Sequence, residues 1–238
     1  MVLVFLDQAD GHIKKSSFEA ASYAAKVAEM TSTTAEGILL GTVNDDLSAL
    51  GKYGIKKVHT VSDATLNNLD AQVYTKIIAQ AAEATGADVI VCSHNTSGKA
   101  IAPRLSVRLK AGLVSGAAAL PDLSNGFTVK KTVFSGKAFA NIAVTSAKKI
   151  IALNPNSFDI ITTAGTAEVV PFAATIDPFK VEVTNTQKVT GEVSLSEAEI
   201  VVSGGRGLKG PENWSLVTDL AKLLGAATAC SRPVADTD

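Results

Sequence analysis

The stretch Ala198-Glu-Ile-Val-Val-Ser203, followed directly by Gly204-Gly-Arg-Gly-Leu-Lys-Gly-Pro-Glu-Asn-Trp214, decides the fold of the C-terminal part of the chain. Its first six residues form an apolar run that is typical of a strand. The run meets a G-x-G-x-x-G pattern, and Pro211 suits the first position of a helix. Apolar residues then follow at helical spacing up to Gly225: Trp214, Val217, Leu220, Ala221 and Leu224. The stretch therefore predicts a strand, a glycine loop and a helix.

The glycine loop allows two interpretations. Glycines let a backbone approach a ligand closely, and a helix N-terminus offers unpaired N–H groups to an anion. A tight turn without a ligand explains a glycine motif equally well. The next predicted strand, Ala226–Ser231, ends in Ser231 and Arg232, where an NAD-binding unit would have an acidic residue for the ribose. A hydroxyl and a fixed cation argue against ordinary NAD binding and favour a group that becomes anionic, such as a reduced flavin ring.

The first part of the chain alternates short apolar runs with helical patterns. Near-continuously apolar strands that alternate with helices predict a mainly parallel sheet covered on both faces, an α/β fold. Strands are expected at Val2–Leu6, Gly37–Val43, Lys56–Val61 and Asp88–Ser93.

Three helices are expected between and after these strands. Ser16-Ser-Phe-Glu19 has the pattern of a capping box, which predicts a helix from there to about Met30. Asp70 can cap the next helix, and Gly86 can close it. The third is expected at Gly98–Ala111, with an apolar stripe on one face: Ile101, Leu105 and Leu109.

The middle of the chain predicts antiparallel hairpins that extend the sheet. The strand-like runs are Phe127–Phe134, Ala138–Val144 and Lys148–Leu153, and a last short strand is expected at Phe179–Thr184. Polar composition predicts a linker after it. The expected organisation is an N-terminal α/β domain over residues 1–184, a linker over 185–197 and a second domain over 198–238.

The charge balance excludes some classes of partner. With 22 basic and 23 acidic residues, the chain has no overall basic field for nucleic acid or an anionic membrane. No apolar stretch approaches the roughly 20 residues of a membrane helix. The N-terminus lacks the basic segment of a signal peptide, so we expect a bacterial cytoplasmic protein. Cys92 and Cys230 form no C-x-x-C pair, which predicts buried free thiols rather than a metal or redox site.

Three further features have simpler structural interpretations. Gly98-Lys99 suggests a phosphate loop, but the leading glycine is absent and Ala100 replaces the usual hydroxyl residue. His94 follows Cys92, and no residue in the sequence pattern would orient the pair as a catalytic dyad, so a packing histidine is expected. Asp45-Asp46 is expected in the first turn of a helix, where acids favour the helix dipole.

The C-terminal motifs together resemble those of one family. Val201–Gly207, Gly210–Trp214 and Cys230–Asp236 occur in the order and spacing found at the entry to the flavin domain of electron-transfer flavoprotein α subunits. The segments Ala87–Ile90 and Gly98–Leu105 of the first domain also resemble recurring segments of that family.

The resemblance implies a heterodimer with a β subunit and one FAD between the subunits. It implies electron transfer from dehydrogenases, such as the acyl-CoA dehydrogenases of fatty acid β-oxidation, to a membrane quinone reductase. It implies that Arg206 and Ser231 contact the flavin and that Arg232 lies at the isoalloxazine ring, where its charge favours the anionic form. Gly205 and Gly207 are the expected cofactor-binding glycines of the loop. The family's AMP site belongs to the β subunit, so no nucleotide is expected in the first domain.

The chain departs from the family pattern at its end, because the sequence stops at Asp238, directly after the match to Arg232. We expect the first βα unit of an incomplete Rossmann-like FAD-binding domain, which alone would hold FAD weakly or not at all. Two alternatives stay open: a nucleotide-dependent oxidoreductase that uses the glycine loop, and a subunit-docking module without a cofactor.

Overall fold

The computed structural model describes residues 1–186, 195 and 198–236. Most of the predicted linker, residues 185–197, lies outside the described residues. The chain divides into two compact units, Met1–Val183 and Thr184–Asp238. Each unit has a sheet of its own.

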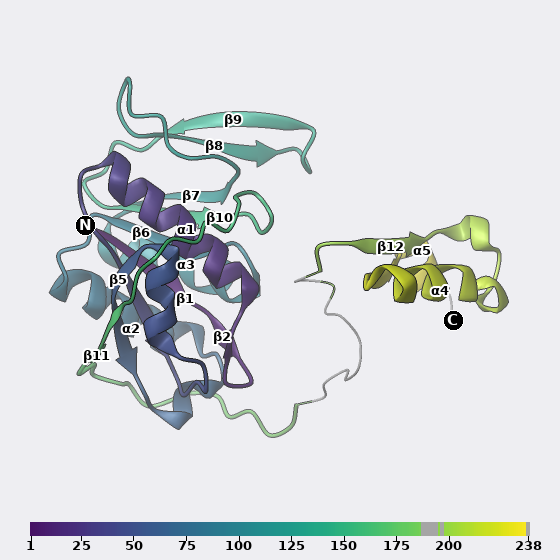
Figure 1. Ribbon diagram of the computed structural model, residues 1–238, viewed down its shortest axis with the longest axis horizontal. Helices are drawn as coiled ribbons and strands as arrows, with labels where there is room; N and C mark the ends of the chain where they lie inside the picture. The colour runs from purple at the N-terminus through teal and green to yellow at the C-terminus, as the bar shows by residue number, and fades with distance from the viewer. Residues whose placement is uncertain (187–194, 196–197, 237–238) are drawn as a thin grey trace. The chain divides into compact units, whose positions relative to one another are not determined.

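The first unit is built on one sheet, which has nine strands among the described residues (Figure 1). Their order is β11-β5-β4-β1-β6-β10-β7-β8-β9. From β11 to β7 the strands run parallel, and β8 and β9 complete the sheet as an antiparallel hairpin. The prediction of a mainly parallel sheet in an α/β fold is therefore confirmed. The bounds are β1 Val2–Leu6, β4 Ala35–Leu40, β5 Ile55–Val61, β6 Val89–Ser93, β7 Gly112–Ala117, β8 Thr128–Val133, β9 Ala138–Ala143, β10 Lys149–Leu153 and β11 Glu168–Pro171.

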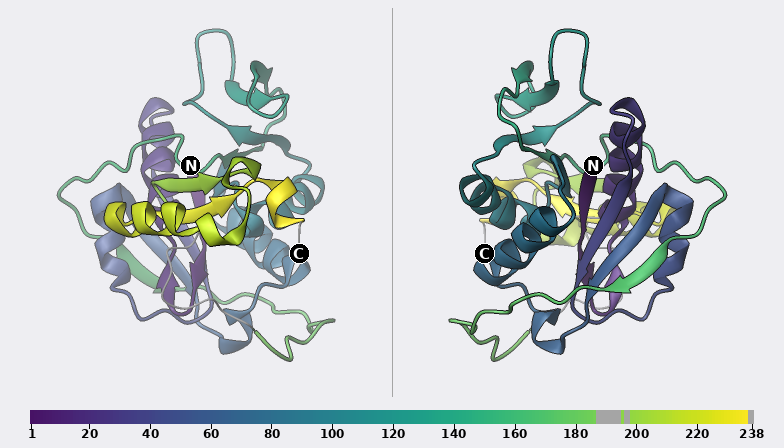
Figure 2. Two further views of the ribbon diagram at one scale, coloured as in Figure 1. Left: turned by 90° about the vertical axis from the view of Figure 1, so that its right-hand side faces the viewer. Right: turned by 90° about the vertical axis from the view of Figure 1, so that its left-hand side faces the viewer.

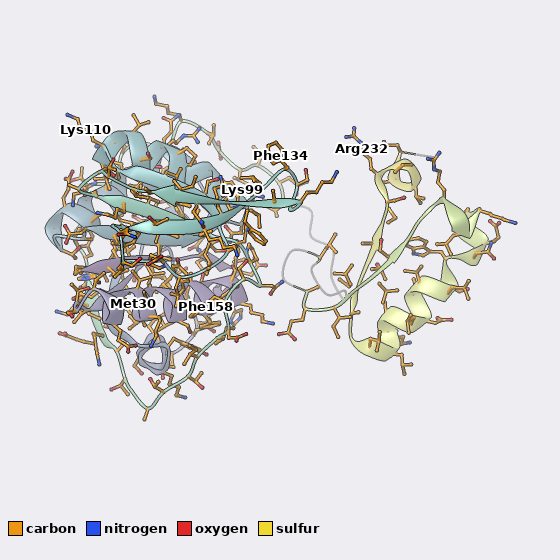
Figure 3. The ribbon with its side chains drawn as sticks, turned by 90° about the horizontal axis from the view of Figure 1, so that it is seen from above. Met30, Lys99, Lys110, Phe134, Phe158 and Arg232 are labelled. Atoms are coloured by element: carbon orange, nitrogen blue, oxygen red, sulfur yellow. The ribbon has the colours of Figure 1, made fainter. Side chains whose placement is uncertain are left out.

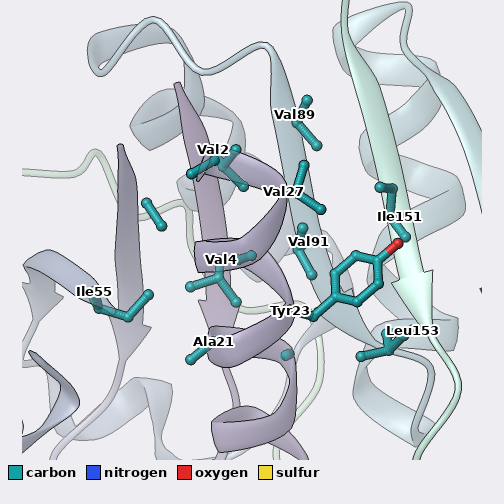
Figure 4. Packing of buried hydrophobic residues seen from close by; sticks show 14 of the residues in the cluster. Val2, Val4, Ala21, Tyr23, Val27, Ile55, Val89, Val91, Ile151 and Leu153 are labelled. Carbon is teal, nitrogen blue, oxygen red and sulfur yellow. The ribbon is translucent and has the colours of Figure 1, made fainter. Parts of the chain in front are cut away.

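Helices cover both faces of this sheet (Figure 2). α1 (Lys15–Met30) and the 3₁₀ helix η1 (Leu47–Tyr53) pack on one face, while α2 (Ala71–Ala84) and α3 (Thr96–Leu109) pack on the other. Strand β1 alternates between the two layers, as expected from its two-residue period. Val2 and Val4 face α1, where Tyr23 packs beside them (Figure 4), and Leu6 belongs to the same layer. Leu3 and Phe5 face α2 and α3. The predicted stripe of α3 is buried as expected: Ile101, Leu105 and Leu109.

The helix starts were predicted with mixed success. Asp70 caps α2 as expected, with its carboxylate accepting from the backbone N–H groups of Gln72 and Val73 at 2.8 and 3.2 Å. The capping box at Ser16 is wrong. Helix α1 begins at Lys15, and no side chain caps it.

Glu19 explains the failure of the capping box. Its buried carboxylate accepts from three consecutive backbone N–H groups of residues 156–158, at distances between 2.8 and 2.9 Å. A tertiary partner therefore takes the acceptor that a local cap would have used. Asp46 was expected in the first turn of a helix. It lies just before that turn, as the N-cap of η1, and its carboxylate accepts from the Ser48 N–H at 3.0 Å.

Two strand predictions are wrong. Lys148–Leu153 was expected in an antiparallel hairpin, but β10 runs parallel between β6 and β7 near the middle of the sheet. Phe179–Thr184 is not a strand. Phe179 instead packs on the α2 layer, and Val181 and Val183 are exposed, so the alternating polarity there reflects a surface segment. The edge strand is the shorter β11, which pairs with β5.

The strand order places a topological switch point between β1 and β6. From β1 the chain continues to β4 and β5 on one side, and it then crosses to β6 on the other side. Ligands of open α/β sheets bind outside the carboxyl ends of strands at such a point. Two short strands, β2 (Gln8–Ala9) and β3 (His12–Ile13), follow β1 at this edge.

The second unit is a parallel two-stranded sheet with one connecting helix. β12 (Val201–Gly204) leads through the glycine loop into α4 (Ser215–Leu224), and β13 (Ala227–Cys230) leads into the short α5 (Arg232–Ala235). The predicted strand-loop-helix-strand order is confirmed, although β12 begins three residues later than expected. Gly225 ends α4 in the left-handed conformation, with φ of 61°.

Helix α4 exposes several apolar side chains. Val217 and Ala221 are buried against the two strands, whereas four leucines of the helix are exposed: Leu216, Leu220, Leu223 and Leu224. Among the described residues, no helix of either unit is both long and apolar enough to cross a membrane.

Candidate functional site

The glycine loop between β12 and α4 contains two single-turn 3₁₀ helices. They are η3 (Arg206–Leu208) and η4 (Pro211–Asn213), so Pro211 opens η4 rather than α4 itself. No side chain caps the N-terminus of η3, η4 or α4. Uncapped N-termini leave backbone donors for water or a ligand, and an anion suits them best.

Gly204 lets the loop close over the end of β12. A Cβ at Gly204 would collide with the Leu208 side chain and lie 2.7 Å from the ring of Trp214. These two side chains therefore occupy the space that a larger residue would need. The absence of a side chain at Gly204 sets the position of the loop.

A pocket of about 550 Å³ lies between this loop and the end of β13. Its volume falls in the range of small-molecule sites. Its lining consists of Gly205, Arg206, Leu208, Lys209, Gly210, Pro211, Trp214, Cys230 and Val234. Two of these residues are cationic and none is acidic, while the aromatic and aliphatic side chains supply apolar walls. This set of groups fits an anionic molecule with a planar apolar part, such as a flavin dinucleotide.

The predicted site residues lie near this pocket but not all in its wall. Gly205 and Arg206 line it. Ser231 lies beside them, because its N–H donates to the Gly204 carbonyl at 3.0 Å and its hydroxyl would lie 3.9 Å from a Cβ at Gly205. A Cβ at Gly207 would meet open space. The structure thus brings Gly205, Arg206 and Ser231 together at the end of β12.

Arg232 lies apart from the pocket wall. It is the first residue of α5, its side chain is 91% exposed, and its Nε is 3.3 Å from the Asp236 carboxylate (Figure 3). Neither Arg232 nor Ser231 nor Gly207 belongs to the pocket lining. A contact between Arg232 and a flavin ring therefore stays a prediction.

Sequence reasoning missed two pocket residues that carry chemistry. Lys209 lines the pocket together with Arg206, and its presence inside a glycine loop was the signal that could have identified it. Cys230 was expected to be buried but is exposed at the pocket, because it ends an edge strand of a two-stranded sheet. Cys92 is buried as expected, and burial raises the pKa of its thiol to about 12.

The carboxyl edge of the first sheet carries a polar network around His94. Its Nδ1 is 3.1 Å from the side-chain oxygen of Asn154, and its Nε2 is 3.3 Å from the Ser115 hydroxyl. Asn154 donates its amide N–H groups to Thr132 and to the carbonyl of Gly116, which leaves its oxygen to accept from the ring. His94 is thus a packing histidine with two partners, whereas the sequence had suggested none.

Charge and burial around His94 favour the neutral ring. Burial lowers the pKa of His94 below its ordinary value of 6.5. The hydrogen bond to Asn154 opposes this shift, and the charges of Lys99 and Lys131 reinforce it. A neutral ring can donate from Nδ1 and accept at Nε2, which matches its two neighbours.

The switch point of the first sheet is filled by the chain's own side chains. The Asn95 oxygen caps α3 by accepting from the Gly98 N–H at 3.0 Å. The Asn95 amide nitrogen donates to Asp7 at 2.9 Å, and Lys14 donates to the same carboxylate oxygen at 2.7 Å. Asp7 and Lys14 form an ion pair there, and the Gly98 N–H that a phosphate would need is already bonded to Asn95. This arrangement agrees with the interpretation of Gly98-Lys99 as something other than a phosphate loop.

Comparison with known proteins matches both units of the chain to one family. The model of the electron transfer flavoprotein domain matches residues 2–177, and the model of the electron transfer flavoprotein FAD-binding domain matches residues 194–238.

Three similar proteins cover nearly the whole chain. A protein described as electron transfer flavoprotein subunit alpha from Syntrophomonas wolfei is 29% identical, over 98% of this chain and 74% of its own length. One with the same description from Bacillus subtilis is 28% identical, over 100% of this chain and 74% of its own length. Protein FixB from Clostridium saccharobutylicum is 28% identical, over 97% of this chain and 71% of its own length.

Proposed function

The chain belongs to the electron transfer flavoprotein family, and from this premise we propose that it is the α-type subunit of a heterodimeric, FAD-containing electron carrier. One observation carries the proposal. The pocket with two cations and apolar walls lies at the glycine loop, within the residues that resemble the family's FAD-binding domain. The chain then acts as a carrier subunit rather than as an enzyme with its own substrate.

The residues at the end of β12 can hold the cofactor in complementary ways. Arg206 offers a permanent positive charge at the pocket wall, and the Ser231 hydroxyl can donate a hydrogen bond beside Gly205. The missing side chains of Gly205 and Gly207 leave space for close approach of a ligand to the backbone. FAD, when bound, supplies the ring that accepts electrons and passes them on.

Arg232 is proposed to act through its charge. Its guanidinium stays protonated near neutral pH, so it stabilises negative charge that develops on a neighbouring ring. Its exposed side chain is paired with Asp236 only at 3.3 Å, a weak contact that the side chain can exchange for a ligand. A charge-assisted hydrogen bond of this kind contributes roughly 1–3 kcal/mol.

The electron donors and the acceptor are proposed by family resemblance. We propose acyl-CoA dehydrogenase-type donors of fatty acid oxidation and a membrane quinone reductase as acceptor. The cytoplasmic location also stays a prediction. A nicotinamide-dependent oxidoreductase is the alternative, but β13 ends in Cys230 and is followed by Ser231 and Arg232, so no acidic residue stands where a ribose would be held.

The β8–β9 hairpin is our proposed docking surface for the partner β subunit. β9 is the edge strand at the end of the sheet opposite β11, and an edge strand offers unpaired backbone groups to another chain. Phe134 at the hairpin turn is 79% exposed (Figure 3), and Phe139 on β9 is 59% exposed. Exposed aromatic side chains beside an open edge are typical of an interaction surface.

Co-expression with a β-type subunit tests the function. The purified complex should show the absorbance of a flavin, and Arg232→Ala should lower the midpoint potential of that flavin. A complex without flavin absorbance contradicts the carrier function, and an unchanged potential removes the role of Arg232.

Paired surface variants test the docking site. Changing both Phe134 and Phe139 to serine should reduce co-purification of the β subunit. Val107→Ser is the matched control, because Val107 is 81% exposed on α3, away from the hairpin. Equal losses for the double variant and the control would remove the hairpin from the interface.

A further inference from the structure

Lys209 holds the most unusual backbone conformation of the glycine loop. Its φ and ψ are 66° and −34°. The carbonyl of Leu208 accepts from the N–H of Gly210 at 2.9 Å, which closes a three-residue turn around Lys209. This is the γ-turn with positive φ at its centre, a rare and strained conformation.

The glycines of the loop do not take this conformation. Gly205 and Gly210 are extended, with φ of −120° and −168°. The φ of Gly207 is not positive either. Any residue can adopt the extended backbone, whereas glycine is the residue that best tolerates the conformation of Lys209. The residue under strain is therefore the lysine, at the one place in this loop where glycine would relieve it.

The matched comparison is Lys110, the other lysine of the described residues with positive φ. Lys110 is the C-cap of α3, with φ of 52° and ψ of 40°, the ordinary left-handed conformation at a helix end. Its place is explained by local structure. Lys209 is also a C-cap, of η3, but its ψ of −34° lies outside the left-handed region that ends helices, and strain of this kind is kept where the side chain has a function.

The charge of Lys209 also lacks a partner within the part of the chain that the structure describes. Among the described residues, no carboxylate pairs with the side chain of Lys209 or with that of Arg206. Both side chains border the same pocket, and the pocket lining includes no acidic residue. Two unpaired cations at one pocket create a positive potential that an anionic ligand can neutralise.

We propose that Lys209 is a second cationic contact for the flavin dinucleotide and that its strained turn holds the ammonium group at an anionic part of that cofactor. The proposal rests on the proposed function, and it deepens that function by assigning a binding residue. The anionic part is either the pyrophosphate or the reduced ring. Both have the same requirement, a charge-assisted hydrogen bond from a cation fixed at the pocket wall.

Three variants of Lys209 separate strain from charge. Lys209→Gly removes both, so it should raise the urea midpoint of unfolding of the second unit while weakening FAD binding. Lys209→Met keeps the strained turn and a side chain of similar length, so it should weaken FAD binding without a gain in stability. Lys209→Arg should keep most of the affinity. Lys110→Gly is the control, and it should leave FAD affinity unchanged.

The measurement is the dissociation constant of FAD for the chain in complex with its β-type subunit, by flavin fluorescence. Loss of a hydrogen bond to a charged group corresponds to about a tenfold or larger weakening for Lys209→Gly and Lys209→Met. Titration with ADP and with reduced riboflavin then separates the two sources of negative charge. Weakening for ADP assigns Lys209 to the pyrophosphate, and weakening for reduced riboflavin assigns it to the ring.

Two results overturn the proposal, and they differ in what else they overturn. If Lys209→Met binds FAD, ADP and reduced riboflavin as tightly as the unchanged chain, Lys209 has no binding role, although the carrier function stands. If the unchanged complex binds none of the three, the carrier function fails and the role of Lys209 fails with it.

Discussion

Two strand-helix junctions of this chain, one in each unit, have the same topology but opposite chemistry. In the first unit, β6 leads into α3 through Ser93-His-Asn95, and polar side chains of the chain itself occupy the junction. In the second unit, β12 leads into α4 through Gly204–Trp214, where no side chain caps the helix and a pocket of about 550 Å³ remains.

The difference shows how one supersecondary unit serves either structure or binding. At the first junction, Asn95 satisfies the helix N-terminus, and the ion pair of Asp7 with Lys14 fills the switch point, so polar groups of the chain itself take the place of a ligand. At the second junction, glycines replace such side chains, and Arg206 and Lys209 supply positive charge instead. The strand-helix order alone therefore does not identify a binding site. The side chains at the junction decide whether its backbone donors are already used.

Gly98→Ala is expected to have the largest effect on stability. A Cβ at Gly98 would collide with the backbone carbonyl oxygen of Ser93, which cannot move without shifting β6. Overpacking against backbone predicts a loss of about 2–3 kcal/mol in the free energy of unfolding, measured by urea denaturation. The matched change at the second junction is Gly207→Ala, where a Cβ meets open space and the loss should stay below about 0.5 kcal/mol. Equal losses would mean that both glycines are structural and would break the comparison.

Asn95→Ala should have the next largest effect. The change removes the cap on Gly98 and one of the partners of Asp7, and the loss of an N-cap destabilises a protein by about 1–2 kcal/mol. Asn213→Ala is the corresponding change in the second loop, where the amide of Asn213 donates to the Leu208 carbonyl at an exposed site. The loss of stability for Asn213→Ala should be smaller, because the hydrogen bond that it removes is exposed. A larger loss for Asn213 would show that the second loop also depends on its own side chains.

His94 should give the first unit a smaller, pH-dependent contribution. Because burial lowers the pKa of His94 below 6.5 in the folded state, the unfolded chain binds the proton more readily. Stability from this group is thus fully present above pH 6.5 and is lost as the pH falls below it. His94→Gln should reduce this acid-dependent loss, measured as the urea midpoint of the first unit between about pH 7.5 and 5. Residues 198–238 contain no histidine, so the second unit should lack this step. An identical pH profile in His94→Gln would contradict the assignment.

Local patterns predicted the elements of the fold well. The stripe of Ile101, Leu105 and Leu109 depends only on helical spacing, and the Asp70 cap depends only on neighbouring N–H groups. Predictions failed where a distant partner decides the outcome. Glu19 binds residues 156–158 instead of its own helix end, and β10 enters the middle of the sheet by a long-range pairing. Neither partner can be identified from spacing along the chain.

The candidate site was predicted in part for the same reason. Gly205 and Arg206 belong to a recognisable motif, and the structure places both at the pocket. Lys209 was missed because its significance lies in its backbone conformation, which residue types do not reveal. The cofactor-binding roles of all five predicted residues stay predictions: Gly205, Arg206, Gly207, Ser231 and Arg232.

The central claim is that FAD binds at the second junction and not at the first. The most direct test compares the loss of one cationic side chain from each junction. The dissociation constant of FAD is measured for the complex with the β-type subunit, in Arg206→Ala and in Lys99→Ala, a change of an exposed lysine in the first turn of α3 (Figure 3). If the second junction is the flavin site, Arg206→Ala should weaken binding about tenfold or more, and Lys99→Ala should leave it unchanged. Weakening by Lys99→Ala with no effect of Arg206→Ala would contradict the account and place the cofactor at the first junction.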